Sequence, residues 1–385
     1  MKKEISPWIV VAAILLTLVV VQVVYWRGLM GGPGGQRLPM RGGGGGHGAE
    51  TAAPVGKPGV TVITLAGGPQ PGYRDGPGSE ALFRGPAGLA VSADGTVYLA
   101  DSRNHCIRKL TPTGVVSTLA GAPAEDAVGG FADGVGAEAR FSSPAGVALA
   151  PDGSLLVSDT GNHRLRRVTP SGRVSTFAGA DTERDDLGRP VGGYRDGSAA
   201  EARFRYPAGL AVDEAGTVYV ADAGNGRVRR ISPAGEVTTL ATVGGQALQA
   251  PTELVLAAGG KLWVADTAGG GLWVGPREGP LQRWQPEPGE KGPKAPAGLA
   301  ARDQAIYVAD AGDHCLLRIV GDRLSLVAGE REAASTGYAD GYGNLARFSS
   351  PAGLALGPGG DVYVADYGNN CIRRVRIDRR YQEGR

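Results

Sequence analysis

One unit recurs six times along the chain, and this repetition limits the possible folds more than any other feature of the sequence. Each copy opens with PAGLAV or a variant of it, and a second apolar run such as TVYLAD ends 14 or 15 residues after the opening proline. A turn and a basic segment such as RLRRV follow. Short apolar runs bounded by turn residues are typical of strands, so each copy predicts three strands. The opening prolines and closing aspartates are Pro86 and Asp101, Pro144 and Asp159, Pro207 and Asp222, Pro251 and Asp266, Pro296 and Asp310, and Pro351 and Asp366.

A fourth strand completes the unit. VVSTLAG, RVSTFAG, EVTTLAT and RLSLVAG follow copies one, two, three and five, and PLQRWQ is a poorer counterpart after copy four. Copy six has no such successor, but VTVITLAG at residues 60–67 precedes copy one and matches the fourth strand. The count balances if this N-terminal strand completes the last blade. We therefore predict an all-β fold, a six-bladed β-propeller of four-stranded blades, closed by the N-terminal strand, because ring closure leaves only short sheet edges.

Composition agrees with this architecture. The chain of 385 residues contains 65 glycines and 26 prolines, which disfavours a large helical protein because glycine costs about 1 kcal/mol in a helix interior. Its hydrophobic fraction of 42% is too high for a disordered chain. The glycines are therefore interpreted as turn residues between many short strands.

The consensus PxGLAV…VYVADxxNHxIRRI resembles the NHL repeat, which is named for an Asn-His-Leu type of signature. Asn104–His105 and Asn162–His163 carry this signature, and Asp313–His314 carries part of it. The resemblance covers about residues 60–378 and implies a six-bladed propeller. It implies no single function, since such propellers serve as protein-binding, RNA-binding and enzymatic scaffolds. Copy four departs most from the pattern, with TAGGGLWVG in place of the basic strand.

The N-terminal segment predicts one transmembrane helix before the propeller. Residues 8–26 carry no charge, and nineteen residues span about 28 Å as a helix, close to the thickness of a bilayer core. Trp8 and Tyr25–Trp26 flank the run as interfacial aromatic residues do. A cleaved signal peptide is the alternative, but the run is long and no small-x-small cleavage site follows it.

These features divide the chain into three parts. We predict a cytoplasmic stub and transmembrane signal anchor at residues 1–27, a Gly/Pro-rich flexible linker at 28–59, and the propeller at 60–385. Lys2 and Lys3 favour a cytoplasmic N-terminus. We therefore expect a single-pass protein of the cell membrane, with the propeller on the extracytoplasmic side.

Charge argues against a nucleic-acid partner. Residues 58–385 contain 34 basic and 36 acidic residues, whereas nucleic-acid binders usually have a basic excess. An NHL domain that binds nucleic acid is kept as an alternative, because paired basic residues could form a local girdle. The structural interpretation is that at least one residue of each pair meets a local acid. These pairs are Arg108–Lys109, Arg166–Arg167, Arg229–Arg230 and Arg373–Arg374.

Neither a metal site, a cofactor nor a set of catalytic residues is predicted. The repeated aspartates open turns, and equivalent positions around a ring do not converge on one ion as metal ligands must. The same holds for His105, His163 and His314. First strands near the axis offer Gly, Leu, Ala and Val. A propeller enzyme of lyase or lactone-hydrolase type, with an unrecognised metal site, remains an alternative.

The three cysteines share one repeat position. Ring geometry separates Cys106, Cys315 and Cys371 beyond the reach of a disulfide, which needs Cα atoms within about 7 Å. We interpret them as small apolar packing residues.

A second motif precedes four of the six copies and supplies the candidate binding site. It reads GYRDGPGSEALFRGP, GFADGVGAEARFSSP, GYRDGSAAEARFRYP and GYADGYGNLARFSSP, before copies one, two, three and six. Its phenylalanine is expected to return to the core, and its turn to build up one face of the propeller. The motif accompanies NHL repeats in some related proteins, so a structural role is one interpretation. Aromatic residues are also enriched in interface hot spots, so we predict that this face binds a protein, peptide or glycan partner. The candidate residues are Tyr73, Arg74, Asp75, Phe131, Asp133, Tyr194, Arg195, Asp196, Tyr338 and Asp340.

Overall fold

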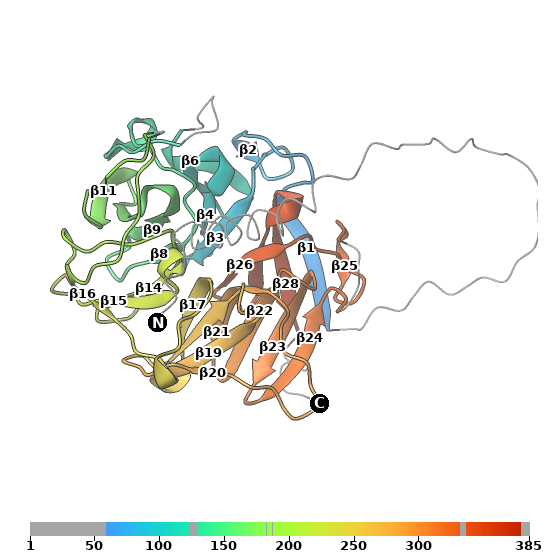
Figure 1. Cartoon of the computed structure of the whole chain (residues 1–385). Coiled ribbons are helices and arrows are strands. Elements are labelled where there is room, and N and C mark those ends of the chain that lie inside the picture. The colour runs from blue at the N-terminus through green and yellow to red at the C-terminus, as the bar shows by residue number, and fades with distance from the viewer. Residues whose placement is uncertain (1–58, 123–128, 182, 187, 332–335, 379–385) are drawn as a thin grey trace, which may run out of the picture. The chain divides into compact units, whose positions relative to one another are not determined.

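Six antiparallel sheets form the blades of a β-propeller in the computed structural model (Figure 1). The model describes residues 59–122, 129–181, 183–186, 188–331 and 336–378. Each blade contains four main strands, so the predicted six-bladed all-β architecture is confirmed within this part of the chain.

The main strands of the first three blades follow the repeat boundaries. Blade one contains β3 (Pro86–Val91), β4 (Val97–Asp101), β5 (Cys106–Leu110) and β6 (Val115–Gly121). Blade two contains β8 (Val147–Leu149), β9 (Leu155–Asp159), β10 (Arg164–Val168) and β11 (Arg173–Ala178). Blade three contains β13 (Pro207–Val212), β14 (Val218–Asp222), β15 (Arg227–Ile231) and β16 (Glu236–Thr239).

The later blades include the irregular fourth copy. Blade four contains β17 (Pro251–Ala257), β18 (Lys261–Asp266), β19 (Gly271–Pro276) and the short β20 (Gln282–Arg283). Blade five contains β21 (Pro296–Arg302), β22 (Ala305–Asp310), β23 (Cys315–Val320) and β24 (Arg323–Ala328). Blade six contains β26 (Pro351–Leu356), β27 (Val362–Asp366), β28 (Cys371–Ile377) and the N-terminal β1 (Val60–Gly67).

The pairing of β1 with β28 closes the ring. Val60 pairs with Ile377 and Val62 with Val375 in an antiparallel ladder. Figure 1 shows this blue N-terminal strand beside the red strands of the last blade. The predicted closure is therefore confirmed.

A two-residue strand lies on the outer edge of blades one, two, three and six, which the sequence did not predict. These strands are β2 (Gly76–Pro77), β7 (Gly134–Val135), β12 (Gly197–Ser198) and β25 (Gly341–Tyr342). Each comes from the linker entering its blade and pairs with the fourth main strand of that blade. The motif therefore folds against the outer edge of its own blade.

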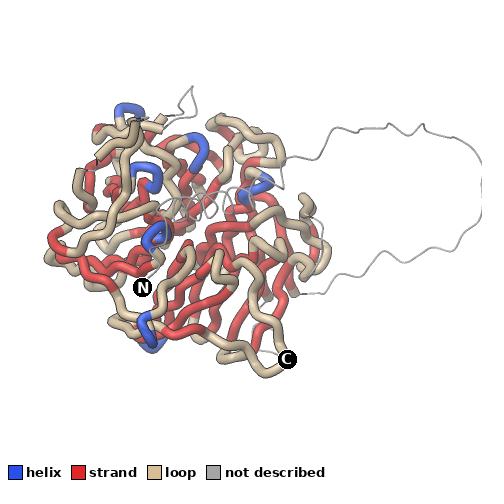
Figure 2. The backbone as a smooth tube through the Cα atoms, in the orientation of Figure 1, coloured by secondary structure: helices blue, strands red, loops and turns tan. Residues whose placement is uncertain are grey.

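Short 3-10 turns complete the fold (Figure 2). Four follow the second strand: η1 (Ser102–Asn104), η3 (Thr160–Asn162), η4 (Ala223–Asn225) and η7 (Tyr367–Asn369). The others are η2 (Gly136–Glu138), η5 (Val243–Gly245) and η6 (Ala258–Gly260). None of the helices in the described ranges is long and apolar enough to cross a membrane. The predicted anchor at residues 8–26 and all but the last residue of the predicted linker at 28–59 lie outside those ranges.

The hydrophobic core lies between neighbouring blades. One cluster joins Ala100 and Ile107 of blade one to Phe141 and Val157 of blade two. The motif phenylalanines are fully or almost fully buried, as predicted, and they are Phe83, Phe141, Phe204 and Phe348. The three cysteines are free and buried, and burial raises the pKa of the Cys315 thiol, so their predicted packing role is confirmed.

Candidate functional site

A buried arginine ties the linker motif to its blade. In blade one, the guanidinium of Arg108 is completely buried between two aspartates, 2.7 Å from Asp101 and 2.6 Å from Asp75. The same group donates to the backbone carbonyls of Leu82 and Arg74 in the linker. Its N–H donors therefore meet two carboxylates and two carbonyls, and the rigid fork of a guanidinium suits such a set of acceptors.

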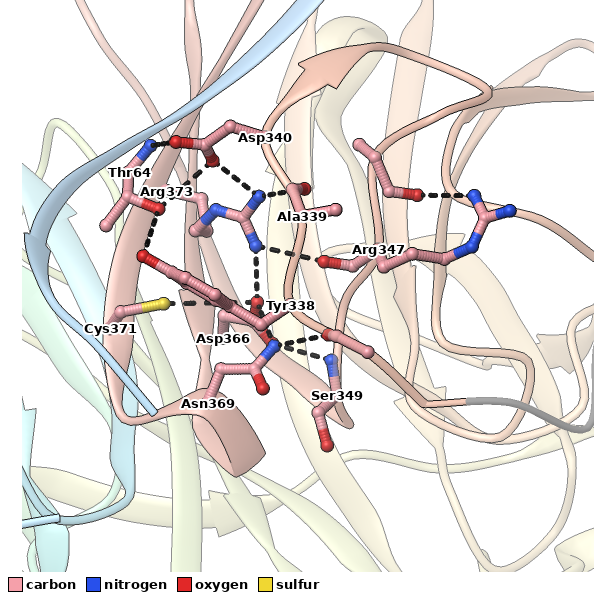
Figure 3. Close-up of polar contacts among 12 residues, drawn as sticks. Thr64, Tyr338, Ala339, Asp340, Arg347, Ser349, Asp366, Asn369, Cys371 and Arg373 are labelled. Carbon is pink, nitrogen blue, oxygen red and sulfur yellow. Dashed lines mark hydrogen bonds and ion pairs between the residues drawn. The ribbon is translucent and has the colours of Figure 1, made fainter. Parts of the chain in front are cut away.

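Blades two, three and six repeat this arrangement. Figure 3 shows it in blade six, where Arg373 lies between Asp366 at 2.8 Å and Asp340 at 2.7 Å. The corresponding residues are Arg166, Asp159 and Asp133 in blade two, and Arg229, Asp222 and Asp196 in blade three. The first residue of each basic pair thus meets local acids, as the structural interpretation predicts. In two blades the second residue makes a separate surface ion pair, Arg167 with Asp152 and Arg374 with Asp361.

The asparagine of the NHL signature also holds the linker. Asn104 donates both to the carboxylate of Asp101 and to the carbonyl of Gly72, each at 2.8 Å. Asn369 makes the same pair of bonds in blade six, to Asp366 and Gly337. The signature residue therefore bridges the blade and the linker, and buried carbonyls of the linker are satisfied.

The inner aspartate remains ionised at neutral pH. Burial raises the pKa of Asp101 to about 6, while Arg108 and Asn104 oppose a larger rise. Burial has the same effect on Asp159 and Asp366, whose pKa values are also raised to about 6. Each carboxylate thus carries the charge that its arginine requires.

Each linker aromatic ring covers its arginine from the outside. The Arg108 guanidinium lies 4.7 Å from the ring centroid of Tyr73 and 5.1 Å from that of Phe83, so it is held between two rings. The Tyr73 hydroxyl bonds to Thr118 at 2.7 Å, and the corresponding bonds in blades three and six join Tyr194 to Thr239 and Tyr338 to Thr64. Phe131 takes the same place over Arg166 in blade two.

The predicted binding residues are all exposed at these edges. Tyr73 and Phe131 are each 39% exposed, Tyr194 is 50% and Tyr338 is 43% exposed. The partner aspartates Asp75, Asp133, Asp196 and Asp340 keep between 40% and 47% of their side-chain surface in solvent. The side chains of Arg74 and Arg195 are exposed, while their carbonyls accept from the buried arginines.

The ten candidate residues form four separate sets. Within each blade, the aromatic residue, the aspartate and the buried arginine are in direct contact. The described hydrogen bonds and ion pairs of each set stay within its own blade, since β1 belongs to blade six. The motif therefore presents one repeated patch per blade rather than one joined site.

The histidines of the signature connect neighbouring blades. The backbone N–H of Ser143 in blade two donates to Nδ1 of His105 in blade one at 2.9 Å, and Tyr206 donates to His163 at 3.0 Å. In blade six the equivalent acceptor is Asn370, which receives the N–H of Gly85 at 2.9 Å. Desolvation lowers the pKa of His163 to about 4. These side chains therefore accept hydrogen bonds from the next blade. The described residues contain no group of three His, Cys, Asp or Glu able to hold a metal.

Sequence reasoning missed one residue near the axis. The channel there is lined by first-strand residues of all six blades, which are Ala, Val and Leu as predicted, except for Glu253. The signal was visible in PTELVL, where Glu253 occupies the position that glycine takes in the other five copies.

Blades four and five lack the linker patch and are hollowed instead. A cavity of about 580 Å³ lies between their strand ends and is lined by Trp263, Trp284 and Ile306, together with polar residues that include Gln285 and Gln304. The two indole rings lie 6.1 Å apart at their centroids. Blade four, the least regular copy, is thus a complete blade with a different surface.

Curated relatives and family models agree with the repeat. The NHL repeat model matches residues 83–110, 141–168 and 348–375, and the teneurin NHL domain model matches residues 163–232. Protein SUPPRESSOR OF QUENCHING 1 of Arabidopsis thaliana is 32% identical over half of this chain, and NHL repeat-containing protein 2 of Bos taurus is 27% identical over 81% of it. The chain spans only 18% and 42% of these two relatives.

Solved structures share the fold at low identity. An auxiliary nutrient binding protein of Bacteroides thetaiotaomicron matches with a TM-score of 0.61 at 16% identity, over 83% of this chain and 76% of the other. A streptogramin B lyase matches at 0.54 and 14% identity, and a gluconolactonase of Xanthomonas campestris at 0.53 and 15% identity. Both cover 83% of this chain, and 98% and 90% of the respective neighbours. This fold is compatible with a protein-binding scaffold, and on its repeats, its signature residues and its six blades the chain belongs to the NHL-repeat β-propeller family.

Proposed function

We propose that this protein is a membrane-tethered scaffold whose propeller binds a protein, peptide or glycan partner at the linker edges of blades one, two, three and six. One observation carries the proposal. Each of these edges presents an exposed aromatic ring that is fixed over a buried arginine, beside a half-exposed carboxylate.

Such edges are suited to binding because they are already ordered. A ring that is held in place by stacking and, in three blades, by a hydroxyl hydrogen bond loses little conformational entropy when a partner covers it. The neighbouring carboxylate retains accessible surface for a polar contact. Repetition at four edges would allow several weak contacts to act together on one extended partner.

A cross-linking experiment tests the site. A photoreactive amino acid replaces Tyr73 or Tyr194 in the full chain, in native membranes, and a third variant carries it at Val320, which is exposed on blade five. We expect the same cross-linked partner from the two linker positions and not from Val320. The double variant Y73A/Y194A should weaken capture of that partner while the far-UV spectrum is unchanged. Unaltered capture would reject the site.

The tether is a separate part of the proposal. It rests on the uncharged run at residues 8–26 and the two lysines that precede it. Fusion of a reporter that is active only in the cytoplasm to the C-terminus should give no activity. An active fusion would place the propeller in the cytoplasm, and release of the chain from membranes by high salt would remove the anchor from the proposal.

An enzymatic alternative follows from two of the structural neighbours. A lyase and a gluconolactonase share the fold, although a likeness at 14% and 15% identity extends to the fold alone. Metal analysis of the purified full chain tests this alternative. A stoichiometric, tightly bound divalent ion would favour the enzyme, since such propeller enzymes would need a metal held by convergent side chains.

A further inference from the structure

One ionisable residue interrupts an otherwise apolar channel at the propeller axis. The third residue of the repeat is glycine in five blades, Gly88, Gly146, Gly209, Gly298 and Gly353, and it is Glu253 in blade four. A side chain on Gly88 would collide with the carbonyl of Ala145 in the next blade, and one on Gly353 with that of Ala87. Blade four is therefore the place where the ring accepts a long, ionisable side chain at this repeat position.

The channel has room for a small molecule. Its open cavity has a volume of about 260 Å³ and is lined by fifteen residues, of which fourteen are alanine, valine or leucine. Liquid water would fill it with about eight or nine molecules, at about 30 Å³ each. Apolar walls of this kind favour the methylene groups of a ligand over water, by about 25 cal/mol for each Å² of apolar surface removed from solvent.

Glu253 has no cationic partner within the described residues. Its Oε1 atom accepts one hydrogen bond, from the backbone N–H of Leu254 at 3.0 Å, and no charged group contributes to its electrostatic environment. Glu253 lines the channel, whose other lining residues do not ionise, and a side chain on Gly209 of blade three would meet its Oε1 atom. Desolvation there raises the pKa of Glu253 to about 8. The channel thus contains a carboxyl group without the counter-charge that would keep it ionised.

We propose that the axial channel binds a small organic cation, an alkylammonium group on a short apolar body, with Glu253 as its counter-ion. The ammonium group would supply the missing partner of the carboxylate, and the alkyl chain would contact Leu89, Leu210 and Leu354 on the facing strands. This proposal is independent of the linker edges described above.

Other ligand classes fit the channel less well. An anion would meet a carboxylate, and a divalent metal needs several donors where the lining offers one. A sugar carries many hydroxyl groups, which fourteen apolar residues would leave without hydrogen bonds.

Proton release distinguishes this site from a merely apolar one. At pH 7 a carboxyl group with a pKa near 8 is mostly protonated, and a bound cation restores the ionised form. Binding should therefore release up to about one proton per cation, and affinity should rise as the pH increases from 6 to 8. No other ionisable residue lines the channel to produce this dependence.

The test uses the full chain in detergent and n-butylammonium chloride as the probe. Calorimetric titration measures affinity, and an indicator dye in weakly buffered saline measures the released protons. We expect E253Q to bind the probe about tenfold to a hundredfold more weakly than the native chain, as the loss of a charged hydrogen bond predicts, and without proton release. The uncharged isostere n-butanol should bind the native chain and E253Q with equal affinity.

A second variant separates binding from folding. E253G restores the residue that the other five blades use, and it should also lose the probe while keeping or raising the melting temperature. Equal affinity of E253Q and the native chain for n-butylammonium, or binding without proton release at pH 7, would overturn the proposal. Preferential binding of n-butyrate would overturn it as well.

Discussion

Blades one, two, three and six differ from blades four and five at one buried position. This position lies on the third strand, opposite the middle of the second strand. It is an arginine in blades one, two, three and six, as Arg108 opposite Leu99 illustrates. The same position holds Trp273 in blade four and Leu317 in blade five. The long linkers with their aromatic residue and aspartate occur only before the blades that carry the arginine.

The inner aspartate is common to both groups. Asp266 in blade four accepts from the backbone N–H groups of Gln249 and Ala250, and Asp310 in blade five accepts from those of Lys294 and Ala295. Neither pairs with an arginine in the described part of the chain. The aspartate therefore orders the entry to the first strand in every blade, with or without a cation.

The comparison of the two groups of blades separates the roles of residues that occur together in blades one, two, three and six. The arginine and the signature asparagine attach the linker by donating to its carbonyls, and the outer aspartate of the linker accepts from the same arginine. Blade five confirms the division, since it has Asp313 in place of the asparagine and a short linker. The exposed aromatic edges are thus a consequence of an arginine buried beneath them.

Removal of the arginine should give the largest effect. We expect R108L, which installs the residue of blade five, to lower the free energy of unfolding by about 3–5 kcal/mol, because it leaves the buried Asp101 without its counter-charge. Urea denaturation measures the loss. Limited proteolysis should cut between residues 68 and 85 earlier than in the native chain, since the linker loses its attachment.

A surface ion pair in blade two, between Arg167 and Asp152, is the matched control. R167L removes a pair between half-exposed groups and should cost about 0–1 kcal/mol. If R108L were no more destabilising than R167L, the linker would not depend on the buried arginine, and the comparison between the two groups of blades would fail.

The reverse substitution in blade five should also destabilise the protein. Leu317 is completely buried, and the linker entering blade five lacks the motif whose carbonyls accept from Arg108 in blade one. L317R would therefore bury a guanidinium that only Asp310 could compensate, at a cost of about 3 kcal/mol or more. A urea midpoint equal to that of the native chain would mean that the arginine needs no linker, contrary to the role assigned above.

Much of the fold follows from the sequence because the number of repeat copies determines the number of strands. Six sets of three strands and six fourth strands leave one consistent closure, and β1 pairs with β28 as that count requires. The burial of Phe83 was predictable for the same reason, since a phenylalanine recurs three residues before the opening proline in four of the six copies.

The details of the site were not predictable, because they depend on contacts between residues far apart in the chain. Arg108 and Asp75 are 33 residues apart, and nothing in a basic strand shows which of two adjacent basic residues points inward. The edge strand β2 contains only two residues, too few to form a pattern. Glu253 was visible in the sequence as the exception to a repeated glycine. That it lines the channel became clear only from the arrangement of the six first strands.

The contact between blades two and three should make stability depend on pH. Nδ1 of His163 accepts a hydrogen bond and desolvation lowers its pKa to about 4, so the folded protein takes up its proton at lower pH than the unfolded chain. The stability that this group contributes is present above pH 6.5 and is lost as the pH falls towards 4. Between pH 8 and pH 5 the loss should be about 2 kcal/mol.

Blade six provides the control for this pH effect. H163N introduces the residue that blade six uses at the same position, an acceptor that does not titrate. The difference in unfolding free energy between the native chain and H163N should grow in favour of the variant from pH 8 to pH 5. A constant difference would show that protonation of His163 does not weaken this contact.

The smallest effect concerns the outer ring of the linker edge. Y73F keeps the ring over Arg108 but removes the hydroxyl that bonds to Thr118, so we expect a loss of about 0.5–1.5 kcal/mol in urea denaturation. Blade two already has phenylalanine at this place, which indicates that the ring can stack without the hydroxyl. Partner capture by Y73F should therefore stay close to that of the native chain, whereas Y73A should reduce it. Equal losses of capture in Y73F and Y73A would mean that the hydroxyl, and not the ring, makes the contact, and blade two would then be excluded from the binding surface.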